Sequence, residues 1–244
     1  MAGTVANIAY AYTLSISLVY TMMYLQNPLL IHDNALVAGL SLLPFSIAVF
    51  VFSLGMHWIR LIIPNVMGLL TIGYIAIALN YGILIFLDHS QGYAFWFVPL
   101  LLSGIGIGFL QSNISKFAAE ALPSERMGEA TGIIWTAFYL ASMVSIMTCG
   151  MIYDHIWHQT LMGQLNAAQV APSISAPIVN ALEHGQRTIL YFVHYLPATL
   201  SSELAESYRH ATIQAMKSIM IVSTFSIIGM ALLTLLLHYL AKQK

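Results

Sequence analysis

The chain has 244 residues, of which eight are basic and nine are acidic, so charged residues make up only 7% of the sequence. A soluble domain carries about 25% charged residues, and the hydrophobic share here is 59%. This composition excludes an ordinary water-exposed surface and predicts a membrane protein. The net charge is −1 and Lys and Arg are scattered, so the chain lacks the basic patch that a nucleic-acid partner requires.

Six long stretches without charged residues mark candidate transmembrane helices, because an ionised side chain at mid-bilayer costs at least about 2.5–3.5 kcal/mol. Each stretch exceeds the about 20 residues with which a helix crosses a hydrocarbon core of about 30 Å. No stretch shows the alternation that is typical of a barrel strand. The sequence therefore predicts an all-α, polytopic membrane protein with six transmembrane helices, at residues 5–26, 35–58, 62–87, 93–115, 128–153 and 212–241.

Residues 154–211 are more polar than the predicted spans and contain three prolines, Pro172, Pro177 and Pro197, which interrupt helices. The most apolar piece, residues 188–200, is too short to cross a bilayer, so we expect an interfacial or re-entrant segment there. This pattern predicts three parts: transmembrane helices in 1–153, a long external (periplasmic) region in 154–211, and a final transmembrane helix with a cytoplasmic tail in 212–244.

The distribution of Lys and Arg in the short connections predicts the orientation of the chain. The basic residues of these connections and of the C-terminal tail are Arg60, Lys116, Arg126, Lys242 and Lys244. All five fall on one predicted side, so we expect both termini in the cytoplasm and the long region outside. The first span has no flanking Lys or Arg, and we therefore expect the chain to be a piece of a longer one.

Glycines with a spacing of four indicate close contacts between helices. Gly104 and Gly108 have this spacing inside the fourth span, and Gly128 and Gly132 repeat it in the fifth. A nucleotide-binding glycine run would follow a strand and open a helix, which these glycines do not. We interpret all four as helix-packing positions, with a flexible, cavity-facing helix as the alternative at 104–108.

The first span carries a stripe of polar residues at spacings of three and four: Tyr10, Thr13, Ser17, Tyr20 and Tyr24. Residues with this spacing share one helix face. They either form hydrogen bonds with neighbouring helices or line a substrate cavity. In the first case the stripe is structural, and in the second it contacts a solute.

The fifth span repeats this pattern at Thr131, Trp135, Tyr139 and Ser142. Combining both spans with the polar end of the fourth gives seven candidates for one concave cavity surface: Tyr20, Tyr24, Gln26, Gln111, Asn113, Trp135 and Tyr139. The middle of each predicted span lacks Asp, Glu, Lys and Arg, so we expect any coupling proton to be carried elsewhere.

We expect no metal site, no cofactor and no catalytic residue. Cys149 is the only cysteine, which excludes a disulfide within the chain and metal motifs built from paired cysteines. The enzymatic alternative is a membrane protease, which needs a Ser and a His at the same depth. Ser103 lies near the middle of a predicted span whereas His238 lies near the end of another, so the sequence does not favour an enzyme.

Four segments in order resemble the C-terminal half of the 14-span drug:proton antiporters of the major facilitator superfamily. They are Tyr-Leu-Gln at 24–26, Ala-Gly-Leu-Ser-Leu-Leu-Pro at 38–44, Gly-Ile-Gly-Ile-Gly at 104–108 and Gly-Glu-Ala-Thr-Gly at 128–132. The similarity runs over roughly residues 10–241. It implies one six-helix bundle of a two-bundle fold that holds its substrate between the bundles near the bilayer midplane.

The resemblance further implies a proton-coupled exporter of small hydrophobic or amphipathic compounds in a bacterial cytoplasmic (inner) membrane. The expected partners are the lipid bilayer, a small-molecule substrate, and either a separately encoded N-terminal half or a second copy of the chain. We also expect that the polar stripe needs this partner surface. The alternative is a non-transporting membrane scaffold or the degenerate remnant of a truncated transporter gene.

Overall fold

The computed structural model describes residues 2–31, 34–88, 92–120, 127–184 and 188–243. These residues form ten α-helices and no strand, which confirms the predicted all-α class. Six segments are long and apolar enough to cross a membrane. In chain order the helices are α1 (Ala2–Leu25), α2 (Ala35–Leu40), α3 (Leu43–Leu54), α4 (Met56–Ile62), α5 (Val66–Leu84), α6 (Tyr93–Glu120), α7 (Met127–Ala167), α8 (Pro172–Glu183), α9 (Ile189–Tyr195) and α10 (Ala198–Lys242).

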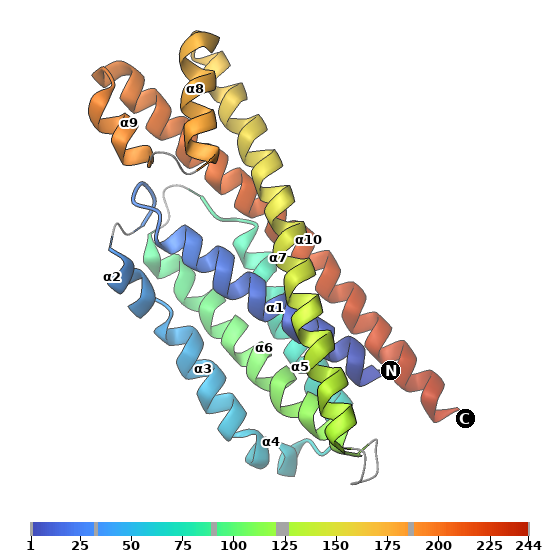
Figure 1. Ribbon diagram of the computed structural model, residues 1–244. Coiled ribbons are helices and arrows are strands. Elements are labelled where there is room, and N and C mark those ends of the chain that lie inside the picture. The colour runs from blue at the N-terminus through green and yellow to red at the C-terminus, as the bar shows by residue number, and fades with distance from the viewer. Residues whose placement is uncertain (1, 32–33, 89–91, 121–126, 185–187, 244) are drawn as a thin grey trace.

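Both termini, α4, the end of α6 and the start of α7 lie at one end of the molecule, and α8 and α9 lie at the other (Figure 1). This arrangement puts the connection that contains Arg60 at the end where the termini lie. Arg126 and Lys244 lie outside the described residues, as do the side chains of Lys116 and Lys242. The basic residues that predict the orientation are therefore only partly visible in the structure.

The second predicted span, 35–58, is divided into α2, α3 and α4. Pro44 has no N–H to donate to the carbonyl of Leu40, and the helix is interrupted just before this proline. The backbone carbonyl of Ser41, within the interruption, accepts a hydrogen bond of 2.9 Å from the Tyr93 hydroxyl at the start of α6. The break in this span is therefore stabilised by the neighbouring helix.

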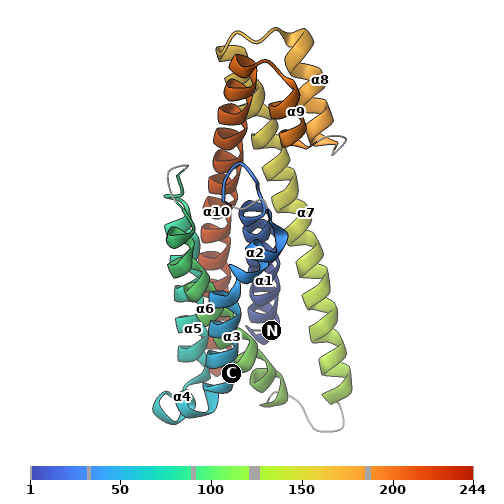
Figure 2. The ribbon, with the colours of Figure 1, turned by 90° about the vertical axis from the view of Figure 1, so that its left-hand side faces the viewer.

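The two longest helices, α7 and α10, have 41 and 45 residues, so they measure about 60 and 70 Å. This is about twice the thickness of a bilayer core. Both extend beyond the other spans and hold α8 and α9 at their far ends (Figure 2). The expected boundaries at 153/154 and 211/212 each fall inside a continuous helix, α7 and α10 respectively. Residues 151–162 of α7 and 198–228 of α10 contain neither Pro nor Gly, the residues that most often end a helix.

Within the bundle, α1 is the central helix and contacts α6, α7 and α10. The helix α3 packs on α6, whereas α5 packs on both α6 and α10. In the view of Figure 2, α7 stands at one side of the bundle and α3 and α6 lie toward the other. The core therefore lies around α1, and α3 and α7 are its two flanks.

The glycines of α6 allow two neighbouring helices to approach closely. A Cβ atom on Gly104 would collide with the Phe45 carbonyl of α3 and lie 2.7 Å from the Ala48 Cβ. A Cβ on Gly106 would collide with Ile77 of α5, and Gly108 faces α3 again. Alternate glycines thus contact α3 and α5, because residues two apart point to nearly opposite sides of a helix.

The polar stripe of α1 is buried inside this bundle. The Ser17 hydroxyl lies 2.9 Å from the Ser103 hydroxyl, and the Tyr20 hydroxyl donates to the Ile146 carbonyl at 3.0 Å. The Thr13 hydroxyl donates within its own helix at 2.8 Å. These three groups have hydrogen-bond partners within the chain, so this part of the stripe is satisfied inside the bundle.

Candidate functional site

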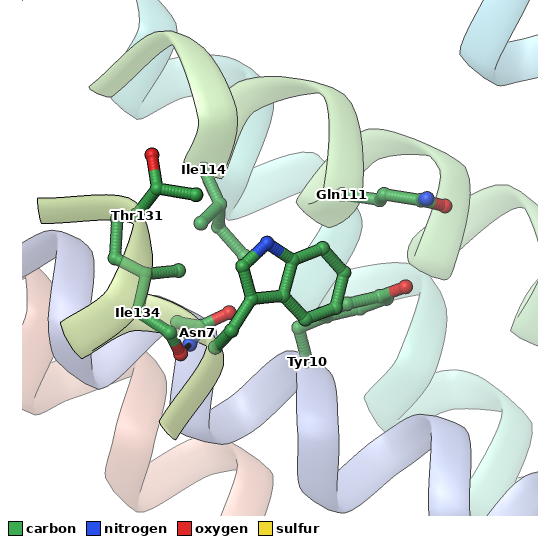
Figure 3. Close-up of a pocket in the computed structure, with 7 residues that line it drawn as sticks. Asn7, Tyr10, Gln111, Ile114, Thr131 and Ile134 are labelled. Carbon is green, nitrogen blue, oxygen red and sulfur yellow. Dashed lines mark hydrogen bonds between the residues drawn. The ribbon is translucent and has the colours of Figure 1, made fainter. Parts of the chain in front are cut away.

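A pocket of about 160 Å³ opens between the N-terminal part of α1, the C-terminal part of α6 and the N-terminal part of α7 (Figure 3). Its walls are formed by Asn7, Tyr10, Gln111, Ile114, Thr131, Ile134 and Trp135. All three helices belong to candidate membrane spans. The pocket therefore lies within the bundle, toward the end where both chain termini lie.

Asn7 fixes the wall between α1 and α7. Its side-chain nitrogen donates to the Ile134 carbonyl at 2.6 Å, and the residue is almost completely buried. An amide in an apolar helix needs such a partner, because an unpaired polar group in hydrocarbon is costly. The bond therefore sets the distance between two of the helices that line the pocket.

Aromatic side chains form a cluster beside the pocket. The rings of Tyr10 and Phe138 have centroids 5.3 Å apart, and Trp135 meets Phe138 edge-on at 5.5 Å. Tyr139 lies 6.1 Å from Trp135 and 5.5 Å from Phe138. Three of the four come from one stretch of α7, where spacings of three and four bring side chains together. The cluster offers ring faces and edges to a flat solute.

The pocket is lined by polar, apolar and aromatic side chains. Its lining combines two amides, from Asn7 and Gln111, with the hydroxyls of Tyr10 and Thr131 and three apolar or aromatic side chains. Among the side chains that the structure describes, none that lines the pocket is an Asp, Glu, Lys, Arg or His. Mostly apolar walls with a few placed polar groups are typical of small-molecule sites.

Only some of the seven residues that the sequence predicts for one cavity lie at this pocket. Gln111 and Trp135 line the pocket, and Tyr139 belongs to the aromatic cluster next to it. Asn7 was not among the seven, although an Asn in an apolar span signals a polar role. For Tyr10 and Thr131, the sequence predicts only that they belong to polar helix faces.

Tyr20 and Tyr24, which we expected to converge with Trp135 and Tyr139, are not among the residues that line this pocket. Both tyrosines are buried, and Tyr24 stacks on Trp96 with centroids 4.8 Å apart. Tyr24 is also about 20 Å along α1 from Tyr10, at 1.5 Å per residue. Tyr20 also contacts the bundle, because its hydroxyl donates to the Ile146 carbonyl and its ring lies 6.2 Å from that of Tyr153.

Gln26 and Asn113 also lie away from the pocket lining. Gln26 is exposed just after α1, at the end opposite the pocket. Asn113 is fully buried, and its side-chain oxygen accepts hydrogen bonds from Arg60. Its amide nitrogen donates to the Phe109 carbonyl at 2.8 Å. Asn113 therefore joins α4 to α6 and does not face a solute.

The two glycines of α7 differ from those of α6. A Cβ atom on Gly128 or Gly132 would meet open space. Neither glycine therefore mediates a helix contact within the described chain, and the packing role that we expected for them is not seen here. Spacing alone cannot distinguish the two pairs, because the glycines of each pair are four positions apart and only one pair faces a neighbouring helix.

No protein-family model matches the chain, and a search of curated proteins finds no matching relative.

Proposed function

We propose that this chain is one six-helix half of a major-facilitator-type secondary transporter that exports small hydrophobic or amphipathic compounds. The observation that carries the proposal is the pocket with its aromatic cluster, placed between candidate membrane spans. Stacking and cation–π contacts there suit flat apolar or cationic solutes and contribute about 0.5–2 kcal/mol each.

The packing of the spans supports this proposal. The second span packs on the fourth through α3 and α6, and the fifth packs on the first through α7 and α1. The third and sixth spans, α5 and α10, contact each other. This reciprocal arrangement is what two inverted three-helix repeats produce, as in the halves of facilitator-type transporters.

An exposed ridge on α7 supports an interaction with solute. Its members follow one another at intervals of four, which is the direction of a helix ridge. They are Trp135, Tyr139, Met143, Met147 and Met151, and their exposed fractions rise from 49% at Trp135 to 72% at Met151. Methionines adapt their shape and suit surfaces that bind varied apolar partners. We call these five residues the α7 ridge and propose that it faces the substrate path and the second half.

A binding measurement tests the site. Ethidium, a planar aromatic cation, should bind to the purified chain with a fluorescence change, and Trp135→Ala should weaken binding about 2- to 30-fold, the loss of one aromatic contact. The matched control is Phe225→Ala, which removes an exposed aromatic from another span, α10. Equal binding by Trp135→Ala and the unaltered chain would contradict the proposed site.

A flux measurement tests the proposal that the chain is one half of a transporter. In proteoliposomes with an imposed pH gradient, the chain alone should show no proton-coupled ethidium transport, because the substrate path lies between two bundles. Robust coupled flux from the monomer would refute this part while leaving the binding site intact. The binding measurement therefore tests the proposed site, and the flux measurement independently tests whether the chain needs a second bundle.

A further inference from the structure

The short helix α4 exposes an apolar face at the end of the bundle where both termini lie (Figure 1). Trp58, Leu61 and Ile62 are 70%, 67% and 82% exposed, respectively. Met56 anchors the helix from the other side, in a small buried cluster with side chains of α5 and α6. Exposed Trp at the end of a membrane span is typical of the boundary between lipid tails and water.

Arg60, on the same helix, is fixed by neutral oxygen atoms. Its Nε and Nη2 donate to the Asn113 side-chain oxygen at 3.3 and 3.1 Å, and Nη2 also donates to the Ser112 carbonyl at 2.8 Å. Asn113 is itself held by its bond to the Phe109 carbonyl. The guanidinium therefore has a set position before any ligand arrives.

The positive charge of Arg60 is not neutralised by these contacts. Its hydrogen-bond acceptors among the described side chains and backbone are an amide oxygen and a carbonyl. Residues 34–87, which include α2 to α5, contain no Asp or Glu. Arg60 thus presents a fixed cation beside exposed apolar side chains, and an anionic amphiphile complements both.

We propose that α4 and Arg60 form a binding site for the headgroup of an anionic phospholipid, in the leaflet at the end of the bundle that carries both termini. The guanidinium binds the lipid phosphate, a geometry for which Arg is well suited. Trp58 lies at headgroup level, and Leu61 and Ile62 contact the acyl chains. The apolar neighbours select a lipid over free phosphate. This site is independent of transport.

Lipid titration of the full chain in detergent, followed by native mass spectrometry, tests the proposal. Phosphatidylglycerol should bind more tightly than phosphatidylcholine with the same acyl chains. Arg60→Gln should reduce phosphatidylglycerol binding about fivefold, the effect of one basic residue at a lipid surface. Phosphatidylcholine binding should fall less, because the choline cation already offsets the charge of its phosphate. Arg60→Lys should keep most of the preference, because it keeps the charge.

Controls separate this site from a general effect of charge or folding. Arg209→Gln removes a cation at the opposite end of the molecule and should leave the preference unchanged. Glycerol 3-phosphate should not displace the lipid; displacement at equal concentration would mean a site for free phosphate and would overturn the proposal. A folded Arg60→Gln chain, with unaltered circular dichroism, that still prefers phosphatidylglycerol would overturn it as well.

Discussion

Arg209 Nε donates a hydrogen bond of 2.7 Å to the backbone carbonyl of Leu29. This bond joins α10 to the segment that follows α1, at the end of the bundle where α8 and α9 lie. A carbonyl just beyond a helix has no helical partner, and the guanidinium supplies one. The hydrogen bond thereby connects the N-terminal part of α10, which reaches beyond the other spans, to the end of the central helix α1.

Arg209→Gln should loosen this connection. We expect residues 27–31 to exchange their amide hydrogens faster, and the chain to lose about 1 kcal/mol of stability, since the bond has a charged donor but is partly exposed. Hydrogen exchange read by mass spectrometry measures the first effect. The control is Glu206→Gln, because Glu206 only pairs with Arg209 at 3.9 Å on the surface. Equal exchange in both variants would contradict the prediction.

Asn7→Ala should destabilise the pocket. It removes the bond to the Ile134 carbonyl, and hydrogen bonds between membrane helices contribute about 0.6 kcal/mol on average and about 1.7 at most. We expect a lower midpoint of thermal unfolding in detergent and weaker ethidium binding. Thr4→Val alters an exposed residue nearly one turn earlier on α1 and should change neither. Unaltered binding by Asn7→Ala would show that this bond does not shape the pocket.

Gly104→Val should destabilise the bundle, because its Cβ would collide with α3. Overpacking of this kind costs about 1–3 kcal/mol. Gly132→Val is the matched variant, since a Cβ there meets open space, and it should be tolerated. Thermal unfolding in detergent, followed by circular dichroism, compares the two. Similar losses at both positions would contradict the prediction.

Accessibility labelling checks the orientation of the chain. In a Cys149→Ala background, a cysteine at exposed Ala176 on α8 should react with a membrane-impermeant maleimide added outside intact cells. A cysteine at Gln243 should react only after the membrane is opened. These two residues lie at opposite ends of the molecule. Labelling of Gln243→Cys from outside would reverse the orientation that the basic residues predict.

The sequence predicts the class of the fold well, because the cost of a buried charge separates lipid-spanning stretches from water-exposed ones. It predicts the ends of helices less well. The polar composition after residue 153 indicates exposure to water, but water does not end a helix, and α7 continues to Ala167. The interruption before Pro44 can be predicted from the sequence, because proline lacks the backbone N–H that would continue the helix.

The candidate site was only partly predictable for a different reason. Periodicity identifies which residues share a helix face, but it does not identify the neighbour of that face. The stripe of α1 and the polar face of α7 have the same spacing, yet Tyr20 is buried and Tyr139 is 61% exposed. Which face is satisfied inside the bundle depends on contacts between segments more than 100 residues apart, such as that of Tyr20 with Ile146.

The length of α7 has a mechanical consequence. The helix that lines the pocket near Thr131 is the same uninterrupted rod that contacts α8 at its other end. A rod of about 60 Å converts a tilt of about 10° into a displacement of about 10 Å at its tip. A small tilt of α7 near the pocket is therefore amplified into a larger movement of α8 at the other end of the molecule.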